Sequence, residues 1–84
     1  MNDRLIACEL HDYVEIACLH RYEVKLTLTD NRCVRGKALD ISTEPDKREY
    51  LLVENGAKQK IELTQIVTLE TLTPGARFQH VRFK

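Results

Sequence analysis

The stretch that decides the fold is Tyr22-Glu23-Val24-Lys25-Leu26-Thr27-Leu28-Thr29. Apolar and polar side chains alternate along it with a period of two, which is typical of a strand that buries one face. Asp30-Asn31 follows, and both residue types tolerate the positive φ of a tight hairpin. The sequence therefore predicts a strand over residues 22–29 and an antiparallel partner strand over residues 32–41.

The apolar residues of the partner strand change phase along its length. Val34 and Ala38 share one phase, whereas Leu39 and Ile41 have the other. A straight strand cannot bury all four on one face, but a bulge or bend between Gly36 and Leu39 allows it. We therefore expect a long, bent second strand.

Three further strands are predicted over residues 49–54, 58–63 and 66–72. Asn55-Gly56 marks a hairpin between the first two, and Thr73-Pro74-Gly75 ends the last one. For residues 76–84 two interpretations stay open, an edge strand and a solvent-exposed tail.

A helix is predicted upstream of the first strand. Asp12-Tyr13-Val14-Glu15 has the form of a capping box, so we expect a helix over residues 12–20. At 100° per residue, Tyr13, Val14 and Ala17 fall on one side of it and Asp12, Glu15 and Leu19 on the other. The expected fold class is mainly β with one N-terminal α-helix, namely a small Sm-like or SH3-like barrel of five bent antiparallel strands capped by the helix.

Length and charge limit the classes of function. The 84 residues suit a single domain, residues 1–84, with little room for an enclosed active site. Basic and acidic residues number 13 each, unlike the basic excess of a protein that coats nucleic acid. Residues 1–20 nevertheless have a charge of −3 and residues 73–84 one of +3. Three cysteines without a CxxC pair, and no signal-like or membrane-spanning segment, predict a cytoplasmic protein.

Metal binding and catalysis find little support. Cys8, His11, Cys18 and His20 are zinc-ligand types, but along a helix the two cysteines would lie about 15 Å apart. No nucleophile motif surrounds any thiol or imidazole, and there is no glycine-rich phosphate loop. We therefore expect no metal site, no cofactor and no enzymatic activity.

The acidic residues of the predicted helix are more informative. Asp12 and Glu15 lie three positions apart, where like charges repel, and neither has a Lys or Arg at i+3 or i+4. Together with Glu9 and the apolar Leu19 they form a face suited to a basic partner surface. A solvated, capped helix end is the simpler interpretation of these residues alone.

Basic clusters at residues 32–37, Lys47-Arg48 and the C-terminal tail are the candidates for nucleic-acid binding. Aromatic residues, on which bases stack, number only five, and among these clusters only the tail contains any. Scattered bases that balance scattered acids are more typical of a solvated surface.

Three segments resemble the Rho-binding antiterminator family, also called Rof or YaeO. They are Cys8-Glu9-Leu10-His11-Asp12-Tyr13-Val14-Glu15-Ile16-Ala17-Cys18, Tyr22-Glu23-Val24-Lys25-Leu26-Thr27-Leu28 and Gly36-Lys37-Ala38-Leu39-Asp40. The resemblance covers about residues 6–72 and implies an N-terminal helix on a small Sm-like barrel.

The resemblance also implies a function. The expected protein is a bacterial inhibitor of transcription termination factor Rho that binds the N-terminal RNA-binding region of Rho and keeps RNA out. It is expected to be monomeric when free, with no direct nucleic-acid or membrane partner. The implied contact surface maps onto Glu9, His11, Asp12 and Glu15, with the loop containing Lys47 as a further candidate, and the exposed-face argument adds Leu19.

An Sm-like RNA-binding protein is the alternative. In RNA-binding Sm rings, the turn between the last two strands has an Arg-Gly or Tyr-Lys-His type signature. The corresponding turn here is Leu63-Thr64-Gln65-Ile66, which has neither.

Overall fold

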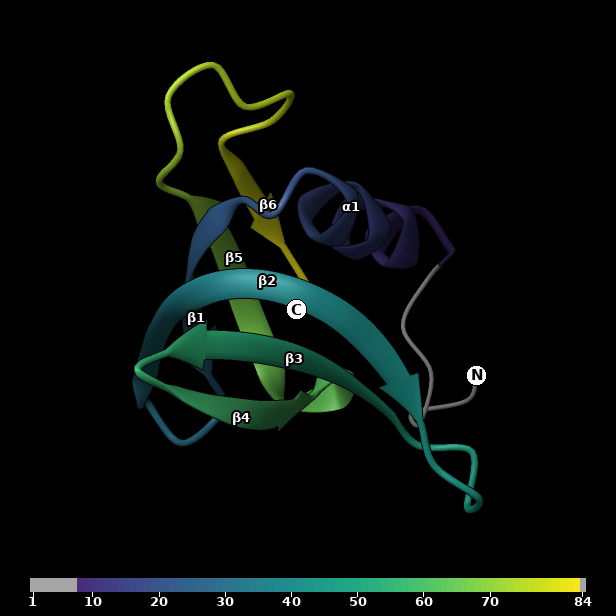
Figure 1. Cartoon of the computed structure of the whole chain (residues 1–84). Coiled ribbons are helices and arrows are strands. Elements are labelled where there is room, and N and C mark those ends of the chain that lie inside the picture. The colour runs from purple at the N-terminus through teal and green to yellow at the C-terminus, as the bar shows by residue number, and fades with distance from the viewer. Residues whose placement is uncertain (1–7, 84) are drawn as a thin grey trace.

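The computed structural model describes residues 8–83, with the side chains of residues 8 and 9 left outside the description. One α-helix precedes a sheet of antiparallel strands (Figure 1), which confirms the expected mainly β class with an N-terminal helix. Within residues 8–83 no helix has the length and apolarity that crossing a membrane requires. The elements in chain order are α1 (Cys8–Leu19), β1 (Glu23–Leu28), β2 (Cys33–Thr43), β3 (Glu49–Asn55), β4 (Ala57–Glu62), the 3-10 helix η1 (Leu63–Gln65), β5 (Ile66–Thr71) and β6 (His80–Arg82).

The described strands form a single sheet in the order β4-β3-β2-β1-β5-β6. The expected five strands were one too few, because His80–Arg82 pairs with β5 and forms an edge strand. Only Val81 of β6 is buried, so the strand has almost no alternating pattern of its own. The sheet is strongly curved (Figure 1). It is open, because β4 and β6 are edges that do not pair with each other.

The predicted irregularity in β2 is confirmed. Ala38 pairs with Val53 and Asp40 with Leu52, so the register shifts by one residue between them. The extra residue, Leu39, lets β2 bury Ala38 before the shift and partly bury Ile41 after it. The register shift therefore lets apolar residues of both phases face the core.

Helix α1 begins at Cys8, four residues before the predicted start, so the interpretation of Asp12 as the N-cap is wrong. The Asp12 to Glu15 spacing is equally that of two residues on one exposed helix face, and nothing in residues 9–11 stops a helix. The helix ends at Leu19, after which Arg21 has a positive φ of 54° and the Tyr22 N–H donates to the Ala17 carbonyl.

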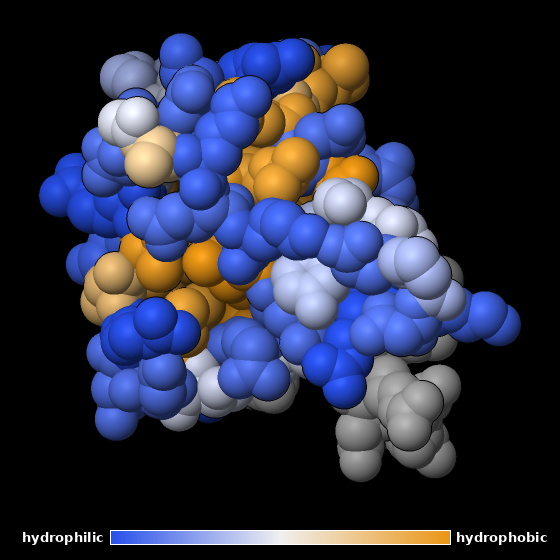
Figure 2. All heavy atoms as spheres, turned by 60° about the horizontal axis from the view of Figure 1, so that its bottom comes forward, coloured by the Kyte–Doolittle hydropathy of each residue, from blue (hydrophilic) through white to orange (hydrophobic). Residues whose placement is uncertain are grey.

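One face of α1 covers an end of the core. Val14, Ala17 and Cys18 are buried against the sheet, in the same cluster as Leu26, Leu51 and Leu69. Tyr13, expected on the buried side, is 37% exposed and packs edge-on against Phe78 of the C-terminal segment, with ring centroids 5.0 Å apart. Seen from the end of the molecule away from α1, apolar atoms are visible between polar side chains (Figure 2). The helix thus closes one end of the sheet.

Candidate functional site: an acidic groove between helix and sheet

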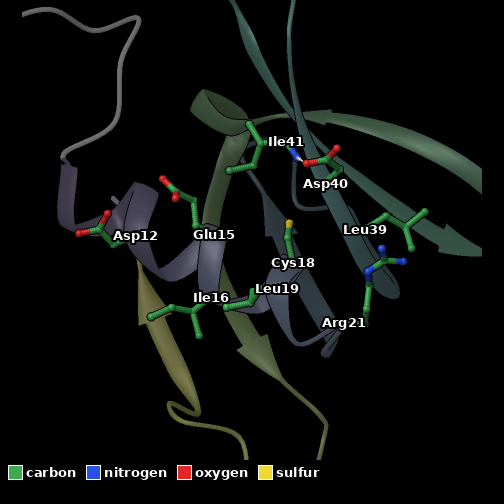
Figure 3. Close-up of a pocket in the computed structure, with 9 residues that line it drawn as sticks. All are labelled: Asp12, Glu15, Ile16, Cys18, Leu19, Arg21, Leu39, Asp40 and Ile41. Carbon is green, nitrogen blue, oxygen red and sulfur yellow. Dashed lines mark hydrogen bonds between the residues drawn. The ribbon is translucent and has the colours of Figure 1, made fainter.

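A groove with a volume of about 760 Å³ lies between α1 and β2 (Figure 3). Its walls come from segments far apart in sequence, the exposed face of α1 and the part of β2 at and after the register shift. The lining residues are Asp12, Glu15, Ile16, Cys18, Leu19, Arg21, Leu39, Asp40 and Ile41. The groove therefore contains three of the six residues expected to contact a partner: Asp12, Glu15 and Leu19.

Three carboxylates give the groove its charge. Asp12 and Glu15 come from the helix and Asp40 from β2, against the single guanidinium of Arg21, which leaves a net charge of −2. All four of these residues are exposed. Oδ1 of Asp40 accepts a hydrogen bond of 2.8 Å from the Ile41 N–H, which restrains the Asp40 side chain at the groove (Figure 3). The groove is therefore an accessible negative surface.

Apolar side chains lie between these charges. Leu19 is 77% exposed and so presents most of its apolar surface to solvent. Ile16, Leu39 and Ile41 are half-buried, so each leaves part of its surface open to solvent. A partner that covered this area would gain from apolar burial as well as from charge pairing.

Cys18 lies in the floor of the groove but is a poor nucleophile. Its side chain is buried, and burial, reinforced by the nearby Asp40 carboxylate, raises the pKa of the thiol from 9.0 to about 11. The thiol is therefore protonated near neutral pH. Over the part of the chain that the structure describes, no group of three or more His, Cys, Asp and Glu residues could hold a metal ion.

His11, expected to contact a partner, forms two contacts within the protein. Its Nδ1 lies 2.8 Å from Oε1 of Glu15 and its Nε2 2.9 Å from Oε2 of Glu49 in β3. A neutral imidazole has one N–H, so donation to both carboxylates requires the imidazolium. Burial lowers the pKa of His11, but the hydrogen bonds to Glu49 and Glu15 and the attraction of both carboxylates outweigh it, so the net pKa is raised. His11 therefore orients the Glu15 carboxylate through its hydrogen bond. It does not itself line the groove.

The remaining two candidates lie elsewhere. The side chain of Glu9 falls outside the described part of the structure, although its backbone belongs to α1. Lys47 lies in the exposed turn between β2 and β3, where it has a φ of 69° and its N–H donates to the Glu44 carbonyl. It does not line the groove.

Sequence reasoning missed the β2 side of the groove. Asp40 lies 28 positions after Asp12 in the sequence. The two residues line the same groove only because α1 packs on the bent strand β2. The one available signal was the phase change around Leu39, which predicted a bend but did not indicate what would face it.

The fold and the groove define a small, mainly β protein with an open, acidic and partly apolar surface beside its N-terminal helix. The chain belongs to the ROF family, modulators of Rho-dependent transcription termination, whose model matches residues 5–83.

A solved structure described as YaeO bound to magnesium, from Vibrio cholerae O395, is similar to the chain. The two superpose with a TM-score of 0.80 and share 30% sequence identity over 87% of this chain and 96% of that one. The comparison with curated proteins gave no significant match.

Proposed function

We propose that the protein inhibits termination by docking the acidic groove on the N-terminal RNA-binding region of Rho. Family membership indicates Rho as the target. The observation that supports the docking face is that Asp12, Glu15 and Asp40 line one groove together with the exposed Leu19. A surface that holds RNA phosphates is basic, so carboxylates can occupy it in place of the phosphates.

The proposed inhibition is competitive and needs no chemical step. The helix face supplies the negative charge, and the sheet behind it supplies bulk that covers neighbouring RNA contacts. The protein acts as a monomer on Rho in the cytoplasm, where transcription takes place, and requires no cofactor and no enzymatic activity.

The test is a three-component competition between the protein, Rho and a cytosine-rich RNA. Asp12→Lys and Glu15→Lys each change the net charge by two at an exposed groove position, and we expect each to weaken Rho binding at least about tenfold because attraction becomes repulsion. Glu54→Lys is the matched control, since it makes the same charge change at an exposed residue outside the groove. Melting curves near wild type would show that the variants are folded.

The outcomes separate the two candidate functions. Competition with RNA that weakens in both groove variants, and not in Glu54→Lys, supports docking on Rho. Affinity for Rho that is unchanged in both reversals would rule out the groove as the interface. Direct RNA binding by the protein alone, with a steep salt dependence, would support the Sm-like alternative.

A further inference from the structure

The groove has two walls that differ in kind. The helix wall contributes Asp12, Glu15 and Leu19 from an exposed helix face, and the strand wall contributes Leu39, Asp40 and Ile41. Apolar side chains therefore lie between carboxylates that come from both sides (Figure 3). A flat acidic patch would have neither the second wall nor the apolar floor.

We propose that this groove receives one long basic side chain of the partner, an arginine or lysine, together with the segment that carries it. The proposal rests on the proposed function, with Rho as the partner. It adds that the cation is bound between the two walls and not on the helix alone, so that Asp40 of β2 is part of the binding site.

The chemistry of the lining fits such an occupant at both ends of the side chain. Arginine and lysine join an apolar stem to a charged head. The half-buried Ile16, Leu39 and Ile41 offer surface to the stem, while Glu15 and Asp40 offer acceptors to the head. Charge-assisted hydrogen bonds of this kind are stronger than neutral ones, and a guanidinium can engage two acceptors at once. The net charge of −2 disfavours an acidic or phosphate-bearing occupant.

Arg21 opposes the binding of a cation in the groove. It is the one basic residue of the lining and lies where α1 passes into β1. A cation in the groove is repelled by Arg21 and attracted to the carboxylates of Asp12, Glu15 and Asp40. Arg21 has a positive φ at the helix end. Gln, like Arg, has an unbranched polar side chain, so Arg21→Gln removes the charge without changing the kind of side chain at this backbone position.

The experiment is a double-mutant cycle on the full-length protein with intact Rho. Asp40→Asn and Glu15→Gln each remove a charge and keep an oxygen acceptor, so the hydrogen bonds to the Ile41 N–H and to His11 can persist. We expect each single variant to weaken Rho binding about three- to tenfold. If one cation is shared, the double variant loses less than the product of the two single effects.

Arg21→Gln supplies a gain of affinity, which misfolding cannot imitate. Removing the repelling charge should tighten Rho binding about two- to fivefold. Lys58→Gln is the matched control, because it removes one positive charge from an exposed position on β4 outside the groove. Equal gains in both variants would reflect net charge alone and would contradict a cation bound in the groove beside Arg21.

The outcomes distinguish this proposal from the proposed function. Weaker binding by Glu15→Gln with unchanged binding by Asp40→Asn would overturn the two-walled site and leave a helix-only interface on Rho. Independent, multiplicative effects would overturn the shared cation. Unchanged affinity in both single variants and in the lysine reversals would contradict the groove as the interface altogether.

Discussion

Nε2 of His11 lies 2.9 Å from Oε2 of Glu49, which joins α1 to β3 across 38 positions of sequence. The second ring nitrogen contacts Glu15 on the rim of the groove. One side chain therefore attaches the helix to the sheet and also orients a carboxylate of the proposed docking surface.

This arrangement predicts a pH-dependent stability. The pKa of His11 is raised in the folded protein, so its contribution is fully present below the unfolded value of about 6.5 and is lost as pH rises through the folded value. We expect His11→Gln to lower the unfolding free energy by up to about 1 kcal/mol at pH 6 and by less at pH 9, measured by urea denaturation. His80→Gln, at an exposed position in β6, serves as control. A pH-independent loss in His11→Gln would contradict the imidazolium.

Gly36 is predicted to be intolerant of a side chain. A Cβ at this position in β2 would lie 2.8 Å from the backbone oxygen of Glu54, so β2 and β3 would have to separate. We expect Gly36→Ala to destabilise the protein by about 1–3 kcal/mol in a thermal or urea melt. Thr43→Ala, at an exposed end of the same strand, should stay within about 0.5 kcal/mol of wild type. Equal stability of the two variants would be inconsistent with the close strand approach.

The two described cysteines should differ in reactivity. Cys18 is buried with its pKa raised to about 11, whereas Cys33 is exposed at the start of β2. Brief alkylation with iodoacetamide at pH 8, followed by peptide mapping, should modify Cys33 at least about tenfold faster than Cys18. In denaturant the two rates should converge. Rapid native labelling of Cys18 would show that α1 opens from the sheet.

Tyr22 is predicted to fasten the C-terminal segment. Its hydroxyl accepts a hydrogen bond of 2.9 Å from the Arg77 N–H, and its ring meets Phe78 edge-on with centroids 6.1 Å apart. Tyr22→Phe keeps the ring contact and loses the hydrogen bond, so we expect a cost of about 1 kcal/mol. Hydrogen exchange should become faster at Arg77 and leave the amide of Leu26 in β1 unchanged. Unaltered exchange at Arg77 would mean that the hydroxyl contributes little.

Local patterns predicted most of the sheet. Alternation defined β1, Asn31 has the positive φ expected of the hairpin, and the two apolar phases of β2 required the shift at Leu39. The start of α1 was missed because Asp12 and Glu15 satisfy both a cap and a helix face. The sequence did not decide between an edge strand and a tail for residues 76–84. Strand β6 has three residues and one buried side chain, so it is defined by its pairing with β5 and not by a local pattern.

Three of the nine residues that line the groove could be predicted from the sequence. Asp12, Glu15 and Leu19 were recognisable because a helix displays its charges at fixed spacing. The i, i+4 spacing of His11 and Glu15 was visible as well, but the role of His11 depends on Glu49. Asp40 and Glu49 join the helix only through tertiary packing, which no local pattern records.

The two-walled groove bears on any attempt to copy this Rho modulator as a peptide. A synthetic segment spanning residues 8–19 would present the helix carboxylates without Asp40, and twelve residues are too few for a stable helix in water. Such a peptide should be a poor competitor even at high concentration. Miniaturisation would have to retain the bent strand, because the proposed recognition surface forms only where the first and third elements of the chain meet.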